Sequence, residues 1–311
     1  MRNTLNKGIV LAFATALISG FAVFFNKFAL SFWSNSSVFT TAKNLIAVFF
    51  LVSLLLIFKK QKELKTLSKK QWVRLAVIGL IGGSIPFLLF FKGLSLTSAT
   101  NAAFIHKTLF VWVALLAIPI LKEKITGLQF LGLPVLFAGV YLFSSPAEFT
   151  MGYGEILVLA ATLLWAAENI IAKIALKEIS SMTVAWGRMF FGSLFLLGFL
   201  SATGNVSELF AFSSAGLGWL ILSGFVLFGY VISWYSALKY APVTVVSSVL
   251  VLAAPITAIL NSVFITHQFN SGLILPIILI LLGSLVVSNL IKNSKLINLF
   301  KIIPILPNKK I

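Results

Sequence analysis

Ten apolar segments follow one another along the chain, and each is long enough to cross a lipid bilayer. They cover residues 7–29, 37–58, 72–91, 98–121, 126–144, 153–175, 182–203, 215–238, 243–265 and 272–291. A helix needs about 20 apolar residues to cross about 30 Å of hydrocarbon, and it satisfies its own backbone hydrogen bonds there. Hydrophobic residues make up 59% of the 311 residues and charged residues only 10%, which excludes a soluble globular domain. The sequence therefore predicts an all-α polytopic membrane protein with ten transmembrane helices.

The basic residues are distributed unevenly between the two ends of these segments. In the ten-helix arrangement, nineteen of the 24 lysines and arginines fall on one side of the membrane, and Lys92 alone falls on the other. Because cytoplasmic loops carry the excess of lysine and arginine, this asymmetry places both termini in the cytoplasm. It also accounts for the net charge of +17 without a nucleic-acid partner. We expect a multi-pass protein of the cytoplasmic membrane, with a basic cytoplasmic tail over residues 292–311.

The two halves of the chain resemble each other. FNKFAL ends the first segment where AKIAL ends the sixth, and KGLSLTSATNAA parallels SALKYAPVTVVSS. Lys43 and Arg188 hold nearly the same place in the second and seventh segments, and Glu123 corresponds to Gln268. An odd number of segments per half means that the second copy is inserted upside down, as in secondary transporters with inverted repeats. We therefore expect two inverted five-helix repeats, over residues 1–145 and 146–291.

Small residues and prolines occur within two of the apolar segments. In the third segment Gly79 and Gly83 form a pair of small residues four positions apart, and Pro86 follows them. Pro255 has a similar place in the ninth segment. Such residues let a helix approach a neighbour closely or bend, and the sequence leaves open which of the two they do here.

Seven polar residues within or near the segments are candidates for binding a substrate. They are Lys43, Asn44, His106, Lys107, Glu168, Asn169 and Arg188. A charged side chain at bilayer depth is costly unless it pairs, faces water or extends to the surface. Lys107 is the deepest cation, whereas Lys43 is close enough to the surface to extend to it. Glu168 is the one acid well inside a segment. We expect it to pair with Arg188, or failing that with Lys107, or to cycle a proton.

These features together resemble the drug/metabolite transporter superfamily, and specifically its EamA-like ten-helix members. The resemblance rests on Lys27 at the end of the first segment, on the cations early in the second and seventh, on LKEKIT, and on ALKYAPVTVVSSVLVLAAPITAIL. It covers essentially the whole chain and implies a secondary transporter with a cavity walled by helices 1, 3, 4, 6, 8 and 9. Two features depart from the family pattern: the polar run at His106 and Lys107, and Gln268 in place of the usual glutamate.

The charge inside the segments favours one class of substrate. Three cations, Lys43, Lys107 and Arg188, face a single glutamate, so an anionic or zwitterionic metabolite would relieve the excess charge. An amino acid or a nucleotide-like compound is typical of that class. A multidrug or cation exporter of the same fold is the alternative.

Other function classes are more remote. The chain has no aspartate, no cysteine and only two histidines, so an intramembrane enzyme has few catalytic groups to use. The short loops also leave little room for a sensor domain. No GxxxxGK[ST] motif is present, so transport would draw on coupled protons or on an exchange substrate. We expect a small-molecule substrate and the lipid bilayer as partners, and no cofactor, metal or nucleic acid.

Overall fold

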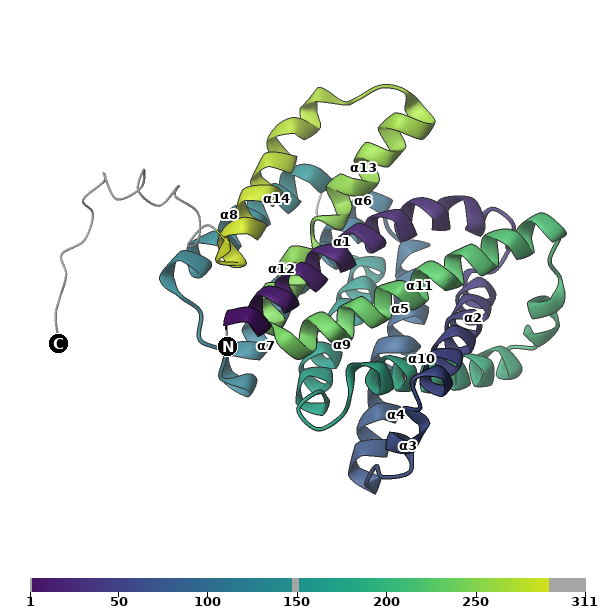
Figure 1. The fold of residues 1–311 in the computed structure, drawn as a ribbon. Coiled ribbons are helices and arrows are strands. Elements are labelled where there is room, and N and C mark those ends of the chain that lie inside the picture. The colour runs from purple at the N-terminus through teal and green to yellow at the C-terminus, as the bar shows by residue number, and fades with distance from the viewer. Residues whose placement is uncertain (1, 147–150, 291–311) are drawn as a thin grey trace, which may run out of the picture.

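The computed structural model describes residues 2–146 and 151–290, which form helices and short connections without any β-strand (Figure 1). The first half contains α1 (Arg2–Leu30), α2 (Ser36–Ile57), the short α3 (Gln61–Leu64), α4 (Lys69–Gly83), α5 (Ile85–Leu94), α6 (Ala99–Lys107), α7 (Leu109–Leu121) and α8 (Gly127–Ser144). The second half contains α9 (Tyr153–Ala175), α10 (Ser181–Ala202), η1 (Val206–Phe210), α11 (Ser214–Tyr240), α12 (Val243–Leu250), α13 (Ala253–Asn261), η2 (Ser262–Thr266), η3 (Ser271–Leu273) and α14 (Ile274–Val287).

Within this part of the chain, nine helical segments of 18 to 27 residues are long and apolar enough to cross a membrane. Three of these segments consist of consecutive helices, which are α4 with α5, α6 with α7, and α12 with α13 and η2. Ser271–Val287 is a shorter tenth apolar helix. The prediction of an all-α polytopic membrane protein with ten membrane helices is thereby confirmed.

The tenth helix ends earlier than the sequence predicts. α14 stops at Val287, whereas the predicted segment runs to residue 291, which lies outside the described residues. Ser288 caps the helix, and Asn289 takes a left-handed backbone conformation with φ 58° that does not continue an α-helix. The basic tail predicted over residues 292–311 also lies outside the described residues.

Matching N-caps relate the second helix of each repeat. The Asn35 side chain accepts a hydrogen bond from the first turn of α2, and Ser180 does the same for α10. Lys43 and Arg188 follow these caps by the same number of residues, as the sequence comparison predicts. The α10 cap is reinforced by Glu63 of α3, whose carboxylate accepts hydrogen bonds from the Ser180 N–H (2.8 Å) and from the Thr183 hydroxyl (2.7 Å).

The fourth and ninth spans also end alike. Lys122 caps the C-terminus of α7, and His267 caps the stretch from α12 to η2. Both cap residues have a left-handed backbone, with φ 56° and 52°. Glu123 and Gln268 follow directly, so they occupy equivalent positions in the two repeats. This agrees with the correspondence that the sequence predicts.

Contacts between the two halves come in matching pairs. α1 packs against α11, and α9 packs against α4 and α5 at the equivalent place. In the same way α2 packs against α11 as α10 does against α4, and α1 packs against α13 as α9 does against α7. α8 and α14 pair with each other at one side of the bundle (Figure 1). This exchange of partners is the packing expected of two inverted five-helix repeats.

The third span is both closely packed and broken, as its glycines and Pro86 allow. A Cβ on Gly83 would lie only 2.7 Å from the Arg188 carbonyl oxygen, so a larger residue would push α4 away from α10. Pro86 has no N–H to donate to the carbonyl of Gly82, and the helix is interrupted at Ser84, which has φ −140° and ψ −76°. The break leaves backbone carbonyl groups inside the bundle without their helical N–H donors.

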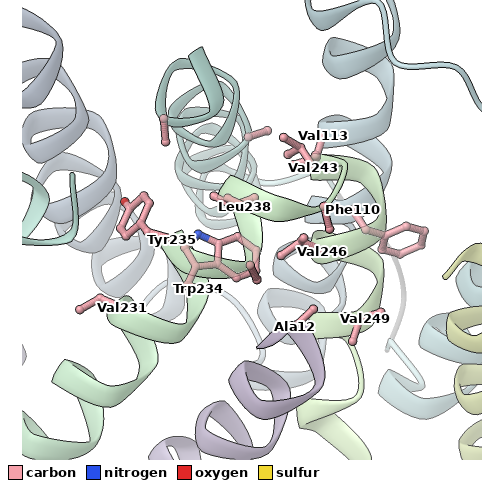
Figure 2. Packing of buried hydrophobic residues seen from close by; sticks show 14 of the residues in the cluster. Ala12, Phe110, Val113, Val231, Trp234, Tyr235, Leu238, Val243, Val246 and Val249 are labelled. Carbon is pink, nitrogen blue, oxygen red and sulfur yellow. The ribbon is translucent and has the colours of Figure 1, made fainter. Parts of the chain in front are cut away.

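The largest apolar cluster lies where the two repeats meet. Figure 2 shows Phe110 and Val113 of α7 beside Val243 and Val246 of α12, and all four are buried. In lipid such an interface is held by close packing rather than by the hydrophobic effect, so complementary shape matters more than apolar area. This packing sets the positions of the two helices that carry the candidate site.

Candidate functional site

A central cavity of about 340 Å³ lies between the two repeats. Its wall is formed by α1, α6, α7, α11, α12 and α13, with one residue from α8. The polar lining residues are Ser19, His106, Lys107, Tyr230, Ser247, Thr257 and Asn261, and the other lining residues are apolar.

The expected wall is right for spans 1, 4, 8 and 9. Described residues of spans 3 and 6 do not line the cavity, because they stand one layer behind it. Phe90 of α5 and Trp165 of α9 pack edge-on against the His106 ring, with ring centroids 5.3 and 4.8 Å away. Phe143 of α8 lines the cavity instead, so the fifth span contributes a residue that the resemblance did not imply.

Two interrupted helices line this cavity. The fourth span breaks at Thr108, between α6 and α7, and the ninth breaks at Leu252, between α12 and α13. Each break follows its N-cap by the same number of residues, from Ser98 to Thr108 and from Pro242 to Leu252. Paired discontinuous helices at a repeat interface are the usual location of the substrate site in transporters with inverted repeats.

The two breaks differ in their local hydrogen bonds. In the ninth span, Pro255 lacks the N–H that would bond the Val251 carbonyl, which instead accepts from Ala254 (3.1 Å). In the fourth span, the Thr108 hydroxyl donates to the Ile105 carbonyl at 2.6 Å. Pro255 is a sequence signal for the first break, although the sequence alone leaves open whether the helix bends there. The second carries no glycine or proline signal, and only its equivalence to the ninth span could have revealed it.

Lys107 is the one formally charged side chain among the described lining residues. Its ammonium lies 5.0 Å from the centroid of the Phe143 ring, a cation–π contact, and it forms no ion pair within the described part of the chain. Adjacent His106 also lines the cavity, and its Nδ1 is buried without a hydrogen-bond partner among the residues that the structure describes. The structure thus brings these two predicted residues to one cavity.

A second polar cluster surrounds the break in the third span. The Gly82 carbonyl, which lacks its helical donor, accepts hydrogen bonds from Trp165 Nε1 (3.0 Å) and Arg188 Nη2 (2.8 Å). The Gly83 carbonyl accepts one from Asn44 Nδ2 (3.3 Å). An unpaired carbonyl inside a membrane protein costs several kcal/mol, roughly, so these donors stabilise the broken helix. Asn44 and Arg188 therefore have a structural task in this state.

Glu168 lies in the same cluster, but its direct partner is a tyrosine. The Tyr235 hydroxyl donates to Glu168 Oε1 at 2.5 Å. No ion pair within 4.0 Å joins Glu168 to Arg188 or Lys107, although Arg188 is close enough to interact electrostatically. The predicted direct pairing is therefore wrong in its geometry. The physical reason is that the Arg188 guanidinium is turned to the free carbonyl of Gly82.

Tyr230 connects the cluster to the cavity. It lines the cavity wall, and it interacts electrostatically with both Arg188 and Glu168. Its ring stacks on Trp234, with centroids 6.1 Å apart and an interplanar angle of 12°. Sequence reasoning missed Tyr230 and Tyr235. The only available signal was the presence of two tyrosines five positions apart in one apolar span.

Of the seven predicted residues, only His106 and Lys107 line the cavity; Asn44, Glu168 and Arg188 belong to the second cluster, and Lys43 and Asn169 also lie outside the wall. The Lys43 ammonium lies 5.1 Å from the centroid of the Phe39 ring and interacts electrostatically with Arg188. Asn169 follows Glu168 in the sequence and is also buried. Its Oδ1 has no hydrogen-bond partner in the described part of the chain. Among the described residues, no group of three or more His, Asp or Glu side chains is placed to hold a metal ion.

Comparison with known proteins gives this arrangement a family. The model of the EamA-like transporter family matches residues 6–145 and 152–289. An uncharacterized transporter from Archaeoglobus fulgidus is 30% identical over 62% of this chain and 68% of its own length, and another from Clostridium kluyveri is 26% identical over 78% and 79%. A crystal structure with 16% sequence identity superposes with a TM-score of 0.75 over 93% of this chain and 99% of that one, which shows a shared fold. The chain therefore belongs to the EamA-like transporter family, and it is a multi-pass membrane transporter.

Proposed function

We propose that this transporter is a secondary active carrier, which moves a small anionic or zwitterionic metabolite across the cytoplasmic membrane by alternating access. The repeats over residues 1–145 and 146–291 would rock against each other around the central cavity, with both termini in the cytoplasm. One observation carries the choice of substrate class. The single formal charge on the described cavity wall is Lys107, and no acidic residue stands beside it.

Charge and desolvation favour an acid group as the ligand of Lys107. An ammonium in a mostly apolar cavity has lost most of its hydration, and a carboxylate or phosphate would restore a strong electrostatic partner. The cation–π contact with the Phe143 ring replaces only part of the lost hydration of this ammonium. A lipophilic cation would meet like charge at the same place.

The cavity also limits the size and character of the substrate. About 340 Å³ is near the lower end of the range for small-molecule sites. Its walls offer several hydroxyl and amide groups, from Ser247, Thr257 and Asn261, among apolar side chains. This combination supports a compound with one acid group and a compact apolar or polar body, such as an amino acid. A nucleotide-like compound, which carries several charges, has less support because Lys43 and Arg188 do not line the cavity.

Energy coupling is proposed to involve the cluster around Glu168. Tyr230 contacts the cavity on one side and interacts with Glu168 and Arg188 on the other. A substrate that binds next to Tyr230 would change the field at Glu168, so that uptake or release of a proton there can accompany transport. Exchange against a second substrate is the alternative form of coupling.

Transport in proteoliposomes tests the substrate class. We expect radiolabelled amino acids and other monocarboxylates to be taken up, and Lys107→Gln to reduce their uptake about tenfold or more through loss of one charge-assisted contact. Lys107→Arg keeps the charge and should retain part of the activity. Lys92→Gln is the matched control because Lys92 is exposed and does not line the cavity.

A different result would favour the multidrug alternative. Strong uptake of a lipophilic cation that survives Lys107→Gln, without competition by any anion or amino acid, would contradict the proposed substrate class. Uptake of acids that is equally strong in Lys107→Gln and wild type would contradict the role of Lys107 alone.

A further inference from the structure

The two ends of the bundle are in different states in this structure. The N-terminus of α12 is closed in, with Val243 and Thr244 only 0% and 3% exposed. The equivalent residues at the start of α6, Ala99 and Thr100, are exposed. In the proposed orientation, α12 starts at the cytoplasmic end and α6 at the outer end. The structure is therefore closed toward the cytoplasm at the place where its outer counterpart is open.

Glu123 makes one of the contacts that close the cytoplasmic end. Its carboxylate accepts hydrogen bonds from the N–H groups of Val243 (2.7 Å) and Thr244 (3.2 Å), and from the Thr244 hydroxyl (2.9 Å). These bonds hold the end of the fourth span against the start of the ninth. The equivalent residue Gln268 is exposed, and its side chain makes no hydrogen bond in the described part of the chain.

Lys173 makes the second closing contact. It lies near the end of α9, and its ammonium donates hydrogen bonds to the Ala241 carbonyl (2.7 Å) and to the Leu238 carbonyl. Both carbonyls lie at the end of the eighth span or in the turn that follows it. Lys173 thereby ties the sixth span to the connection between the eighth and ninth.

A second hollow lies toward the outer end of the ninth span. It has a volume of about 560 Å³, is lined by residues from α13 to η3, shares Ala258 and Asn261 with the central cavity and extends to Gln268. Lys27, the equivalent of Lys173, is exposed at the end of α1 and forms no hydrogen bond or ion pair with any residue that the structure describes. The residues that would complete an outer closure are thus present but apart.

We propose that Lys27 closes the outer end in the opposite state of the transport cycle, by donating hydrogen bonds to the backbone carbonyls of Leu94 and Thr97. These two residues are the equivalents of Leu238 and Ala241, counted from the N-caps Ser98 and Pro242. The inference rests on the proposed alternating access. Because the repeats share one fold in inverted orientation, the contacts that close one end in one state predict those that close the other end in the other state.

Lys27 contributes a larger share of the contacts that close the outer end than Lys173 contributes at the cytoplasmic end. Gln268 takes the place of Glu123, and its neutral amide oxygen accepts weaker hydrogen bonds than a carboxylate does. The outer closure is therefore weaker than the cytoplasmic one. This agrees with a resting state that is closed toward the cytoplasm.

Two single-cysteine reporters test the inference on purified full-length protein in detergent. The native chain has no cysteine. Asn261→Cys, which lines both the central cavity and the adjoining hollow, reports on access from the outer end, and Val245→Cys, 3% exposed next to Glu123, reports on the cytoplasmic end. We measure the rate of labelling by a maleimide-polyethylene glycol reagent. Without further substitutions, the cysteine at position 261 should be labelled quickly and the cysteine at position 245 slowly.

Lys173→Gln should shift the equilibrium toward the outer-closed state. It removes a charge-assisted contact, so labelling of Asn261→Cys should slow and that of Val245→Cys should speed up, on the order of tenfold each. Adding Lys27→Gln should restore the parent rates, and Lys27→Arg should not. Lys92→Gln, another exposed lysine at the outer end, is the matched control and should leave the shifted rates unchanged. Gln268→Glu should slow Asn261→Cys labelling further.

The outcomes separate the two proposals. If the reporters shift in opposite directions but Lys27→Gln restores the rates no more than Lys92→Gln, the role of Lys27 is overturned and alternating access stands. If neither Lys173→Gln nor Glu123→Gln changes the labelling rate of either reporter cysteine, both proposals are overturned. Size-exclusion chromatography of every variant confirms that slow labelling does not reflect aggregation.

Discussion

Replacing Glu168 by glutamine and Arg188 by methionine, singly and together, measures how strongly the buried cluster is coupled. Both side chains flank Gly82, with Glu168 Cδ and Arg188 Nε lying 3.0 and 3.1 Å from the point where a Gly82 Cβ would be. These two atoms are therefore at most about 6 Å apart, by the geometry of that shared neighbour. They do not form a direct ion pair, but two charges at this separation still interact through space.

The expected coupling follows from that separation. Two unit charges about 6 Å apart interact with about 3 kcal/mol at an effective dielectric constant of about 20. Arg188→Met also removes the hydrogen bond to the Gly82 carbonyl and leaves Glu168 without a nearby cation, so it should cost about 3–5 kcal/mol. Glu168→Gln keeps an acceptor for the Tyr235 hydroxyl and should cost less. The double variant should be about 3 kcal/mol more stable than the sum of the two single losses implies.

Unfolding by sodium dodecyl sulfate in mixed micelles, followed by tryptophan fluorescence, measures the four free energies. Additive losses, within about 0.5 kcal/mol, would refute the reasoning. They would mean that the Glu168 carboxyl is neutral in the folded protein, so that Tyr235 and burial alone determine its state. Strong coupling would mean that the carboxylate is charged and balanced by Arg188.

Three further predictions concern the scaffold. Gly82→Ala should destabilise the protein by about 1–3 kcal/mol because the new Cβ would lie 2.5 Å from a side-chain carbon of the buried cluster, whereas Gly198→Ala, with no neighbour within 4 Å, should be neutral or stabilising in thermal unfolding. Burial raises the pKa of Glu63, but hydrogen bonds at the start of α10 outweigh it, so the pKa lies below its ordinary value. The resulting stability is present at neutral pH and is lost as the pH falls through the folded pKa, so Glu63→Gln should lower the melting temperature at pH 7 and weaken its fall below about pH 4; equal acid sensitivity in both proteins would contradict this. A cysteine at Ser34 should react with an impermeant thiol reagent from outside intact cells, and one at Lys65 should not; external labelling at Lys65 would contradict the proposed orientation.

Several levels of this structure could be predicted from the sequence because their causes are local or statistical. The number of spans follows from hydrocarbon thickness, and caps such as Ser68 with Gln71 and Thr126 with Gln129 follow from capping-box spacing. The repeat correspondence also follows, because equivalent positions keep equivalent residue types, as at Lys43 and Arg188.

The candidate site is predictable only in part. Lys107 stands out by its depth alone, and the structure places it on the cavity wall. The break at Thr108 carries no proline or glycine signal in the fourth span, and the hydroxyl-to-carbonyl bond found there also occurs within the unbroken α11. The partner of Glu168 is Tyr235 rather than Arg188, since the missing N–H of Pro86 gives the guanidinium a competing acceptor more than a hundred residues away in sequence.

The sequence by itself determined that this protein crosses the membrane ten times, that its halves are related repeats, and which polar groups lie at bilayer depth. Each of these depends on composition and spacing along one helix. Tertiary structure alone decided which of those groups meet, which end of the bundle is closed, and that Lys173 is engaged while Lys27 is free. The physical reason is that hydropathy constrains the rotation of a membrane helix only weakly. Rotation is set by the packing of all its neighbours at once, and it determines where each polar side chain points.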